Sequence, residues 1–390
     1  MTGFTYLIAD LDSDRTLEEL PLECSGFTSK LKGYGDLRAK LDLGMEGVEQ
    51  LDLPSLLAFG QRSIYVLRDG QVVWGGILWR GSRSPGAQAV ELHAMEFESY
   101  WDRRLLLGDY RPVQVDQLEI ARALVAQSAP LHFGVSGILS GVLRDRAYRV
   151  RDLPVVGKVL SELADCEGGF DFNVLTLADG DGARTRVLRF GYPRLGRPQT
   201  ETNLVFEGSI LQWGDDWDAF ASVTQQHEHG AQVGEGDAAA PLWAVAADTD
   251  GLARGLPMLQ DVNSSHSTVL VQSTLDAYAR ADLAAAPVPV TTHTVSVDAD
   301  GGATDEQVPP DPVLGTYTVG DEARFEISDE WYSARPDGSP GLSIVRRILE
   351  ITVHPADRTV SLVIGPPFEP AYGTGAPIYP ARGAPGFGAP

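Results

Sequence analysis

The chain has 390 residues, of which 43% are hydrophobic, so it is long enough for two to four domains with cores of ordinary composition. Its formal net charge of -23 argues against a protein that binds nucleic acid through clustered lysine and arginine, because an acidic surface repels phosphates. Two cysteines, Cys24 and Cys166, are too few for a disulfide framework and lack the spacing of metal ligands. Both are predicted to be buried thiols.

The first twenty residues carry acidic side chains where a secretory signal would be basic, and no run of eighteen apolar residues occurs. We therefore expect a soluble product with no membrane-spanning segment, made in a cytoplasm. The 42 glycines and 25 prolines exceed average usage, which favours many short strands and turns over a helical bundle.

Residues 1–110 are predicted to form five or six antiparallel strands, enough for a small β-barrel that strands near 200–220 would complete. The hairpin at 62–81 is the clearest of these elements, because Asp69-Gly70 supplies the positive φ angles of a tight turn. Gly75-Gly76 in its second strand predicts a kink or bulge. The other strands are expected at 5–11, 17–31 with a bend at Pro21, 37–44 and 88–101.

Residues 111–200 are predicted to form an inserted α+β domain. Helical stripes follow Asp116, a plausible N-cap, and end at Gly168-Gly169, and a hairpin turns on residues 179–182. Residues 221–367 return to strands as a second β-barrel domain with a helical insertion near 264–286. Residues 368–390 are rich in proline and glycine and are expected to become ordered only against a partner. The predicted fold class is mainly β with an inserted α+β part.

The tripeptide HEH at 227–229 is the most tempting metal-like pattern. In a strand, His227 and His229 point to one face and Glu228 to the other, so a metal ion would need ligands from elsewhere. An exposed polar strand face is the favoured interpretation. The stretch 298–306 begins like a calcium loop but has glycine and alanine where an EF-hand needs its fifth ligand and its glycine. It is predicted to be a solvated hairpin turn, as is 178–184.

The remaining candidates for chemistry are weak. GVSG at 134–137 lacks the spacing of a serine nucleophile elbow, and the adjacent carboxylates Asp215-Asp216 and Glu18-Glu19 would face opposite ways on a strand. We predict no catalytic residue, no cofactor site and no metal site. Seven tryptophans are interpreted as core or interface anchors rather than sugar-stacking platforms: Trp74, Trp79, Trp101, Trp213, Trp217, Trp243 and Trp331.

Several stretches, in this order, resemble minor tail proteins of long-tailed actinobacterial phages, which belong to the tail hub family and are similar to the baseplate hub of contractile phages. The resemblance reaches residue 367. It is carried by YLIADLDSDRTLEELPLECSGFTSKLKGYGDLRAKLDL, RSIYVLRDGQVVWGGILWRG, ELHAMEFESYWDRRLL, SELADCEGGFDFNV, TYTVGDEARFEISDEW and VRRILEITVHPADRTVSLVIGPP.

The resemblance implies two related β-barrel domains of phage tail-hub type, and a trimeric ring whose six barrels match a six-fold tail tube. It implies a virion structural protein at the tail tip, without enzymatic activity. Its expected partners are two further copies of the chain, distal tail or tube proteins, the tape measure protein C-terminus and other minor tail or fibre proteins. Genomic DNA would pass through the ring without specific binding, and an acidic lumen would repel it.

Two other classes of function remain open at this stage. A tail-associated cell-wall hydrolase would need a catalytic constellation, and a carbohydrate-binding adhesin would need several tryptophans on one surface.

Overall fold

The computed structural model describes residues 3–127, 131–166, 168–178, 183–202, 204–234, 240–267, 269–302 and 311–365. The chain divides into two compact units. Unit 1 comprises Met1–Ala164, Phe170–Trp213 and Thr294–Phe368, and unit 2 comprises Asp165–Gly169, Gly214–His293 and Glu369–Pro390. Among the described residues, no helix is long and apolar enough to span a membrane.

A thirteen-stranded sheet dominates unit 1. Its longest path runs in the order β14-β18-β21-β20-β3-β4-β7-β6-β5-β1-β2, and β19 pairs with β20 and with β13 off that path. The strands are β1 (Phe4–Asp10), β2 (Thr16–Leu20), β3 (Leu22–Lys30), β4 (Asp36–Asp42), β5 (Arg62–Arg68), β6 (Gln71–Ser82), β7 (Ala89–Glu96), β13 (Val205–Phe206), β14 (Ile210–Asp218), β18 (Val290–Asp298), β19 (Glu322–Ile327), β20 (Leu342–His354) and β21 (Thr359–Gly365).

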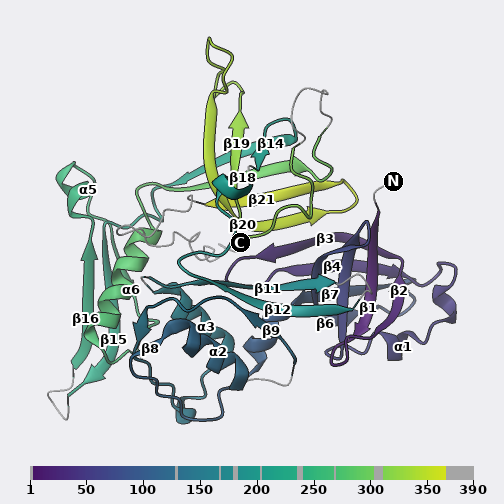
Figure 1. The fold of residues 1–390 in the computed structure, drawn as a ribbon, viewed down its shortest axis with the longest axis horizontal. Coiled ribbons are helices and arrows are strands. Elements are labelled where there is room, and N and C mark those ends of the chain that lie inside the picture. The colour runs from purple at the N-terminus through teal and green to yellow at the C-terminus, as the bar shows by residue number, and fades with distance from the viewer. Residues whose placement is uncertain are drawn as a thin grey trace. The chain divides into compact units, whose positions relative to one another are not determined.

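Strands from the two ends of the sequence meet in this sheet. β3 pairs antiparallel with β20, and Figure 1 shows the purple and yellow strands side by side there. One hydrophobic cluster accordingly contains residues from both ends, such as Leu37 and Leu41 on β4 and Val360 and Leu362 on β21. The alternation of apolar residues along 37–43 therefore predicted the buried face of β4 correctly.

The mainly β fold class is confirmed, but no sheet formed by the described residues closes into a barrel. The path of the large sheet ends at β14 on one side and at β2 on the other. Because β20 joins β3, the strands expected in two separate barrels share one continuous sheet.

The hairpin at 62–81 forms as predicted, with β5 and β6 joined at Asp69 (φ 51°) and Gly70 (φ 82°). The bulge predicted at Gly75-Gly76 is displaced to the residues on either side. The pairing register of β6 shifts against β5 near Val73 and against β7 near Trp79. The glycines serve close packing instead. A Cβ on Gly75 would lie 2.8 Å from the Tyr65 ring, and one on Gly76 would lie 2.3 Å from the Met95 carbonyl oxygen.

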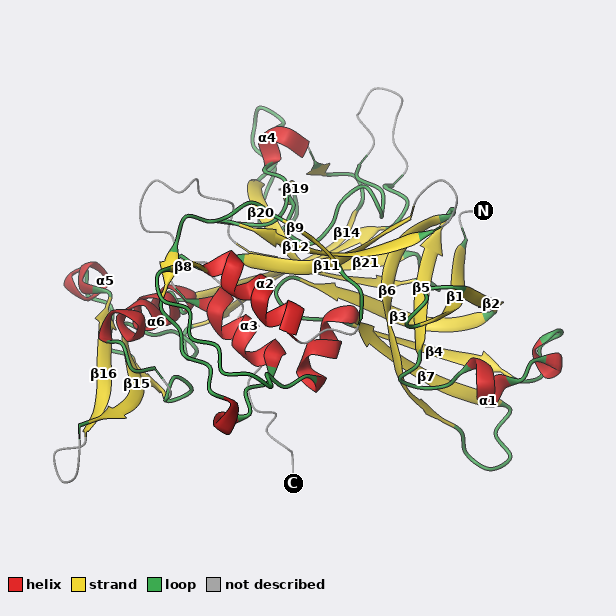
Figure 2. Cartoon of the chain, turned by 60° about the horizontal axis from the view of Figure 1, so that its bottom comes forward, coloured by secondary structure: helices red, strands yellow, loops and turns green. Residues whose placement is uncertain are grey.

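The predicted helices and hairpin between residues 115 and 191 are present. Asp116 caps the first helix, because its Oδ1 accepts a hydrogen bond from the Leu118 backbone N–H at 2.8 Å. Two helices pack on β11 and β12 through a second hydrophobic cluster, as Figure 2 shows. The elements are β8 (Val115–Asp116), α2 (Gln117–Gln127), β9 (Gly134–Ser136), β10 (Leu143–Arg144), α3 (Val156–Asp165), β11 (Asp171–Ala178) and β12 (Arg184–Gly191).

Short helical turns complete unit 1, and the predicted hairpin turn at 179–182 and the tail at 368–390 lie outside the described residues. The turns are η1 (Val48–Gln50), α1 (Leu53–Leu56), η2 (Phe97–Arg103), η3 (Val150–Asp152) and α4 (Gln199–Thr202).

Unit 2 is built from a three-stranded sheet in the order β16-β15-β17, with a helix packed on one face. Figure 1 shows α6 along β15 and β16. The helix predicted from 264 begins eight residues later, at Gln272. The elements are β15 (Gln225–Val233), β16 (Ala240–Ala247), α5 (Thr249–Ala253), β17 (Gln260–Asn263) and α6 (Gln272–Ala285).

Candidate functional site

The HEH tripeptide lies on β15, where strand alternation separates its side chains as expected. His227 and His229 are half-buried on one face of the sheet, and Glu228 is fully buried on the other. The His227 ring lies 3.3 Å from the Gln225 side-chain oxygen, and the His229 ring packs edge-on against Trp243. The two histidines therefore share a face with neighbours from their own sheet, and the glutamate meets different partners.

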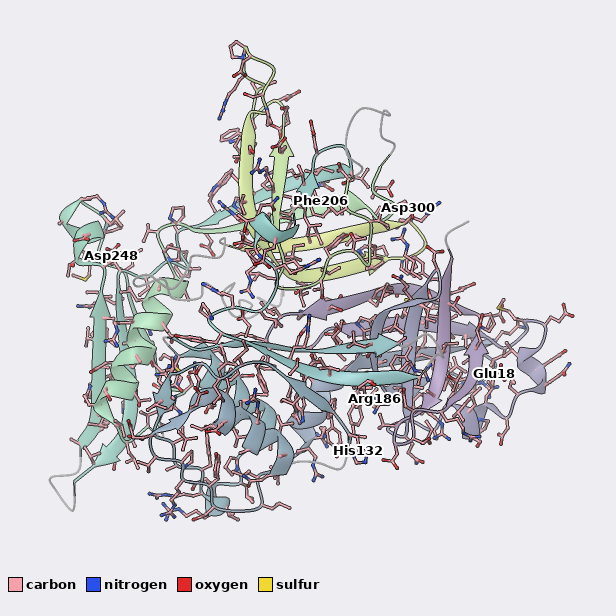
Figure 3. The ribbon with its side chains drawn as sticks, in the orientation of Figure 1. Glu18, His132, Arg186, Phe206, Asp248 and Asp300 are labelled. Carbon is pink, nitrogen blue, oxygen red and sulfur yellow. The ribbon has the colours of Figure 1, made fainter. Side chains whose placement is uncertain are left out.

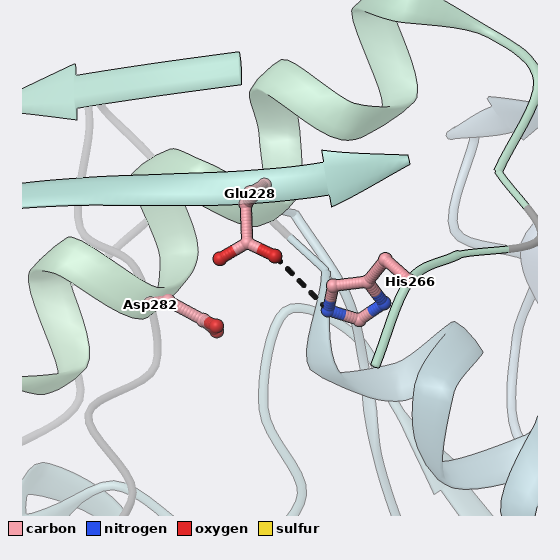
Figure 4. Close-up of side chains that lie close together, drawn as sticks. All are labelled: Glu228, His266 and Asp282. Atoms are coloured by element: carbon pink, nitrogen blue, oxygen red, sulfur yellow. Dashed lines mark ion pairs between the residues drawn. The ribbon is translucent and has the colours of Figure 1, made fainter. Parts of the chain in front are cut away.

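Glu228 lies in a cluster with His266 and Asp282, as Figure 4 shows. Glu228 comes from β15, Asp282 from α6 and His266 from the segment before α6. The Glu228 Oε2 and His266 Nε2 atoms lie 3.7 Å apart, and one ligand atom from each of the three residues lies within 4.8 Å of the others. This Glu–His–Asp cluster is the densest group of metal-ligating side chains among the described residues.

The carboxyl group of Glu228 sits in an unfavourable place for a negative charge. Burial, followed by the nearby charge of Asp282, raises the pKa of Glu228 to about 8. The Gln226 amide opposes the shift by donating a 3.0 Å hydrogen bond to Glu228 Oε1. Glu228 Oε2 is buried and has no hydrogen-bond partner. Such a group can be neutralised either by a proton or by a cation.

Sequence reasoning missed this cluster for an identifiable reason. A continuous helix from 264 to 286 would place His266 and Asp282 sixteen residues apart, a rise of about 24 Å. Because α6 starts only at Gln272, the chain before it folds back and brings His266 to the side chain of Asp282. The sequence did contain one indication of this cluster. Strand alternation places Glu228 on the opposite face of β15 from His227 and His229, and that face is buried.

The calcium-like stretch is engaged in ion pairs. Asp298 Oδ1 accepts from the Asp300 backbone N–H at 2.7 Å, and the Asp300 carboxylate pairs with Arg68 and Arg358. Arg68 is itself buried in unit 1. In the described part of the stretch, the Asp300 carboxylate is therefore paired with arginines and the Asp298 carboxylate caps the turn, and residues 303–306 lie outside the described chain.

The other candidates are dispersed. Ser136 lies on the exposed strand β9, and Glu18 and Glu19 lie on β2, at the end of the large sheet's path, where Figure 3 labels Glu18. Asp215, by contrast, is nearly buried and lies 2.6 Å from the Nδ1 atom of His293 in unit 2. The two side chains form a tight carboxylate–imidazole pair.

Buried arginines in unit 1 have a structural role. Arg186, labelled in Figure 3, reaches from β12 to Asp14 at 2.9 Å and to the Leu11 carbonyl oxygen at 2.8 Å. Arg347 on β20 pairs with Asp171 at the start of β11, and both side chains are almost fully buried. Each pair joins segments that are far apart in the sequence.

The tryptophans divide into two groups. Trp74 and Trp101 are core residues, as predicted for anchors, and Trp213 packs near Phe325 at 6.1 Å. Others are exposed: Trp217, Trp243 and Trp331. The free thiols of Cys24 and Cys166 are buried, as predicted.

The face of the unit 2 sheet that carries the two histidines exposes large apolar side chains. Trp243 and Val245 on β16 pair with His229 and His227, and Val262 on β17 pairs with His227 from the other side. About half of the surface of each of these three apolar residues is exposed. We call this set of five residues the outer face of unit 2. Contiguous apolar surface of this kind marks interaction sites.

Comparison with known proteins identifies the fold. No protein-family model matches the chain, and no curated protein matches it. A 43 kDa tail protein of prophage MuSo2 from Shewanella oneidensis is similar with a TM-score of 0.58 at 12% identity, over 94% of this chain and 99% of that one. A tail protein from Neisseria meningitidis MC58 has a TM-score of 0.55 at 16% identity, over 93% and 96% of the two chains.

A prophage tail protein from Listeria monocytogenes EGD-e is also similar, with a TM-score of 0.50 at 13% identity over 92% of this chain and 94% of that one. All three matches extend over nearly the full length of both partners. The chain therefore has the fold of phage tail proteins.

Proposed function

We propose that the protein is a structural hub of a bacteriophage tail tip, which forms a trimeric ring between the six-fold tail tube and the three-fold tip. The observation that carries the proposal is the end-to-end match to tail proteins, because it includes both units and not one common module. The ordered sequence resemblance to minor tail proteins of actinobacterial phages supports the more specific assignment to a hub.

The proposed architecture keeps two related β-rich domains at 1–110 and 221–367, with 111–200 inserted between them and 368–390 as a partner-binding tail, although their described strands share one open sheet and not two closed barrels. Three copies of such a chain would present six similar domains to a six-fold tube. Strands that do not close a sheet within one chain leave edges that a neighbouring subunit can cover.

The exposed apolar residues of the described chain fit a protein that works in an assembly. Phe220 is completely exposed and Trp331 is 75% exposed, in addition to the outer face of unit 2. Soluble monomers rarely expose contiguous apolar patches, whereas subunit contacts use aromatic anchors. The proposed neighbours are further copies of the chain, distal tail or tube proteins, the tape measure protein C-terminus and minor tail or fibre proteins.

The proposed role is not enzymatic, and the proposed location is the tail tip of the virion. The formal charge of -23 suits a ring through which DNA passes, because a wall with more acidic than basic residues does not bind phosphates.

The experiment that tests the proposal is a mass measurement of the purified chain combined with cryo-electron microscopy of the virion. Three copies of the 42.0 kDa chain predict an assembly of about 126 kDa and a three-fold ring at the tail tip. A functional monomer in the assembled particle would contradict the hub. Lysis of purified host cell walls that a single carboxylate or histidine substitution abolishes would support the hydrolase instead.

A further inference from the structure

The Glu–His–Asp cluster combines an excess of negative charge with an unsatisfied ligand atom. Glu228 is fully buried, and its Oε2 atom faces the His266 ring at 3.7 Å (Figure 4) and has no hydrogen-bond partner. Two carboxylates and an imidazole have the donor atoms that bind divalent cations in proteins. The cluster therefore has both the charge and the free donor that a cation requires.

Neighbouring side chains orient the donors. Asn263 Nδ2 donates to Asp282 Oδ2 at 2.7 Å, and Gln226 Nε2 donates to Glu228 Oε1 at 3.0 Å. The Oε2 atom of Glu228 is thus left for another partner. The His266 ring stacks on Tyr278 with centroids 3.7 Å apart and planes 14° apart, which fixes its plane. Outer contacts that hold ligands in place are a general property of metal sites.

Unit 2 also has little hydrophobic core to hold these elements together. Its buried cluster consists of Leu275 and three alanines, Ala244, Ala246 and Ala279. Small modules with so little apolar burial are commonly stabilised by a disulfide or a metal ion. Both cysteines of the chain are free, which excludes a disulfide in unit 2.

We propose that Glu228, His266 and Asp282 bind one divalent cation of the zinc class, which ties α6 and the segment carrying His266 to β15. The imidazole favours zinc over calcium or magnesium, which prefer oxygen ligands. Bonds of about 2.1 Å to a common zinc ion would bring the ligand atoms to about 3.4 Å from one another. The 3.7 Å between Glu228 and His266 is close to that value, and side-chain rotation of Asp282 would complete the contraction.

The test uses the full-length chain, stripped with a chelator and titrated with Zn²⁺ by calorimetry, with Co²⁺ as a spectroscopic probe. The expected result is one bound Zn²⁺ per chain and a rise in the thermal midpoint on binding. Glu228→Gln and His266→Gln should each weaken binding by at least about 100-fold, more than the loss of an outer-sphere contact.

The matched control is the double variant His227→Gln and His229→Gln, which removes two imidazoles from the opposite face of β15 and should bind Zn²⁺ like the parent. Absence of stoichiometric binding by the parent would overturn the proposal and indicate that the two carboxyl groups share a proton. Binding that the control loses and Glu228→Gln retains would also overturn it. If the Glu228 variant does not fold, X-ray absorption spectroscopy of the zinc-loaded parent counts the imidazole ligands of the metal ion. One imidazole ligand supports the proposed site, and two contradict it.

Discussion

The cores of the two units differ in size and in the sign of their buried charges. Unit 1 buries large rings, such as Phe206 and Phe325 stacked at 5.1 Å, and pairs its buried arginines with carboxylates. Unit 2 packs α6 mainly through alanines and places Glu228 beside a second carboxylate. Unit 1 is thus stabilised mainly by hydrophobic burial and by arginine–carboxylate pairs, whereas unit 2 has a small core and depends more on how its polar cluster is neutralised.

Loss of a buried ion pair is the largest effect that we expect, and it tests the description of unit 1. Arg347→Met leaves the buried carboxylate of Asp171 without its arginine and should lower the free energy of unfolding by about 3–5 kcal/mol. Urea unfolding followed by tryptophan fluorescence measures it. The double variant Arg347→Met and Asp171→Asn should recover much of the loss. An unchanged midpoint for the single variant would show that this pair does not stabilise unit 1.

The thin core of unit 2 is tested at Leu275, the one large residue of its buried hydrophobic cluster. Leu275→Ala should cost about 2–5 kcal/mol, because no other large side chain is fully buried in that cluster. Hydrogen exchange should accelerate in α6 and β15 and stay unchanged in β4 and β20. The exposed Ser273→Ala on the same helix should stay within about 0.5 kcal/mol. Equal acceleration in all four elements would show that the two units do not open separately.

A smaller effect tests how tightly the large sheet is packed. A Cβ on Gly76 would lie 2.3 Å from the Met95 carbonyl oxygen, which is backbone and cannot rotate away. Gly76→Ala should therefore cost about 1–3 kcal/mol, measured from the urea midpoint. Gly208→Ala, where no atom lies within 4 Å of the added Cβ, is the control. Equal midpoints for both variants would contradict the close packing at Gly76.

Unit 1 also contains two buried carboxyl groups whose pKa is raised, Glu96 and Glu98, and Glu96 gives the clearer test. Burial raises the pKa of Glu96 to about 7, although the Gly35 backbone N–H donates to it at 2.6 Å. Since the folded chain then holds a proton that the unfolded chain releases near pH 4.5, this contribution is complete below pH 4.5 and disappears as the pH rises through 7.

The measurement is the unfolding free energy of the parent and of Glu96→Gln between pH 4.5 and 7.5. The parent should lose about 1–3 kcal/mol more than the variant over this window. A constant difference between the two proteins across the window would show that Glu96 keeps its ordinary pKa.

The sequence predicted local structure well and long-range pairing poorly. Alternation located β4, the Asp69-Gly70 turn located the β5–β6 hairpin, and Asp116 located the start of α2, because each depends on neighbouring residues. No local pattern indicates that β3 pairs with β20, more than three hundred residues away. For the same reason, two separate barrels were expected where the structure has one continuous sheet.

The candidate site was predicted only in part. The HEH pattern indicated β15, the strand that contributes Glu228 to the cluster. Strand alternation correctly predicted that Glu228 faces away from His227 and His229. His266 and Asp282 could not be joined to it, because their meeting depends on where α6 begins. In the sequence, the serine-rich residues before Gln272 resemble the first turn of a helix, whereas in the structure the helix begins only at Gln272.

The pairing of β3 with β20 has a consequence for synthesis of the chain. Thr28 and Thr352, whose hydroxyl groups lie 2.9 Å apart across these strands, are separated by 324 positions. At a translation rate of about 5–20 residues per second, β3 leaves the ribosome roughly 15–65 s before the strand that covers it. During that interval, the edge of β3 that will pair with β20 is unpaired and open to the wrong partner. Lys30, the last residue of β3, is a charged side chain of the kind that disfavours pairing of an open strand edge with the wrong partner.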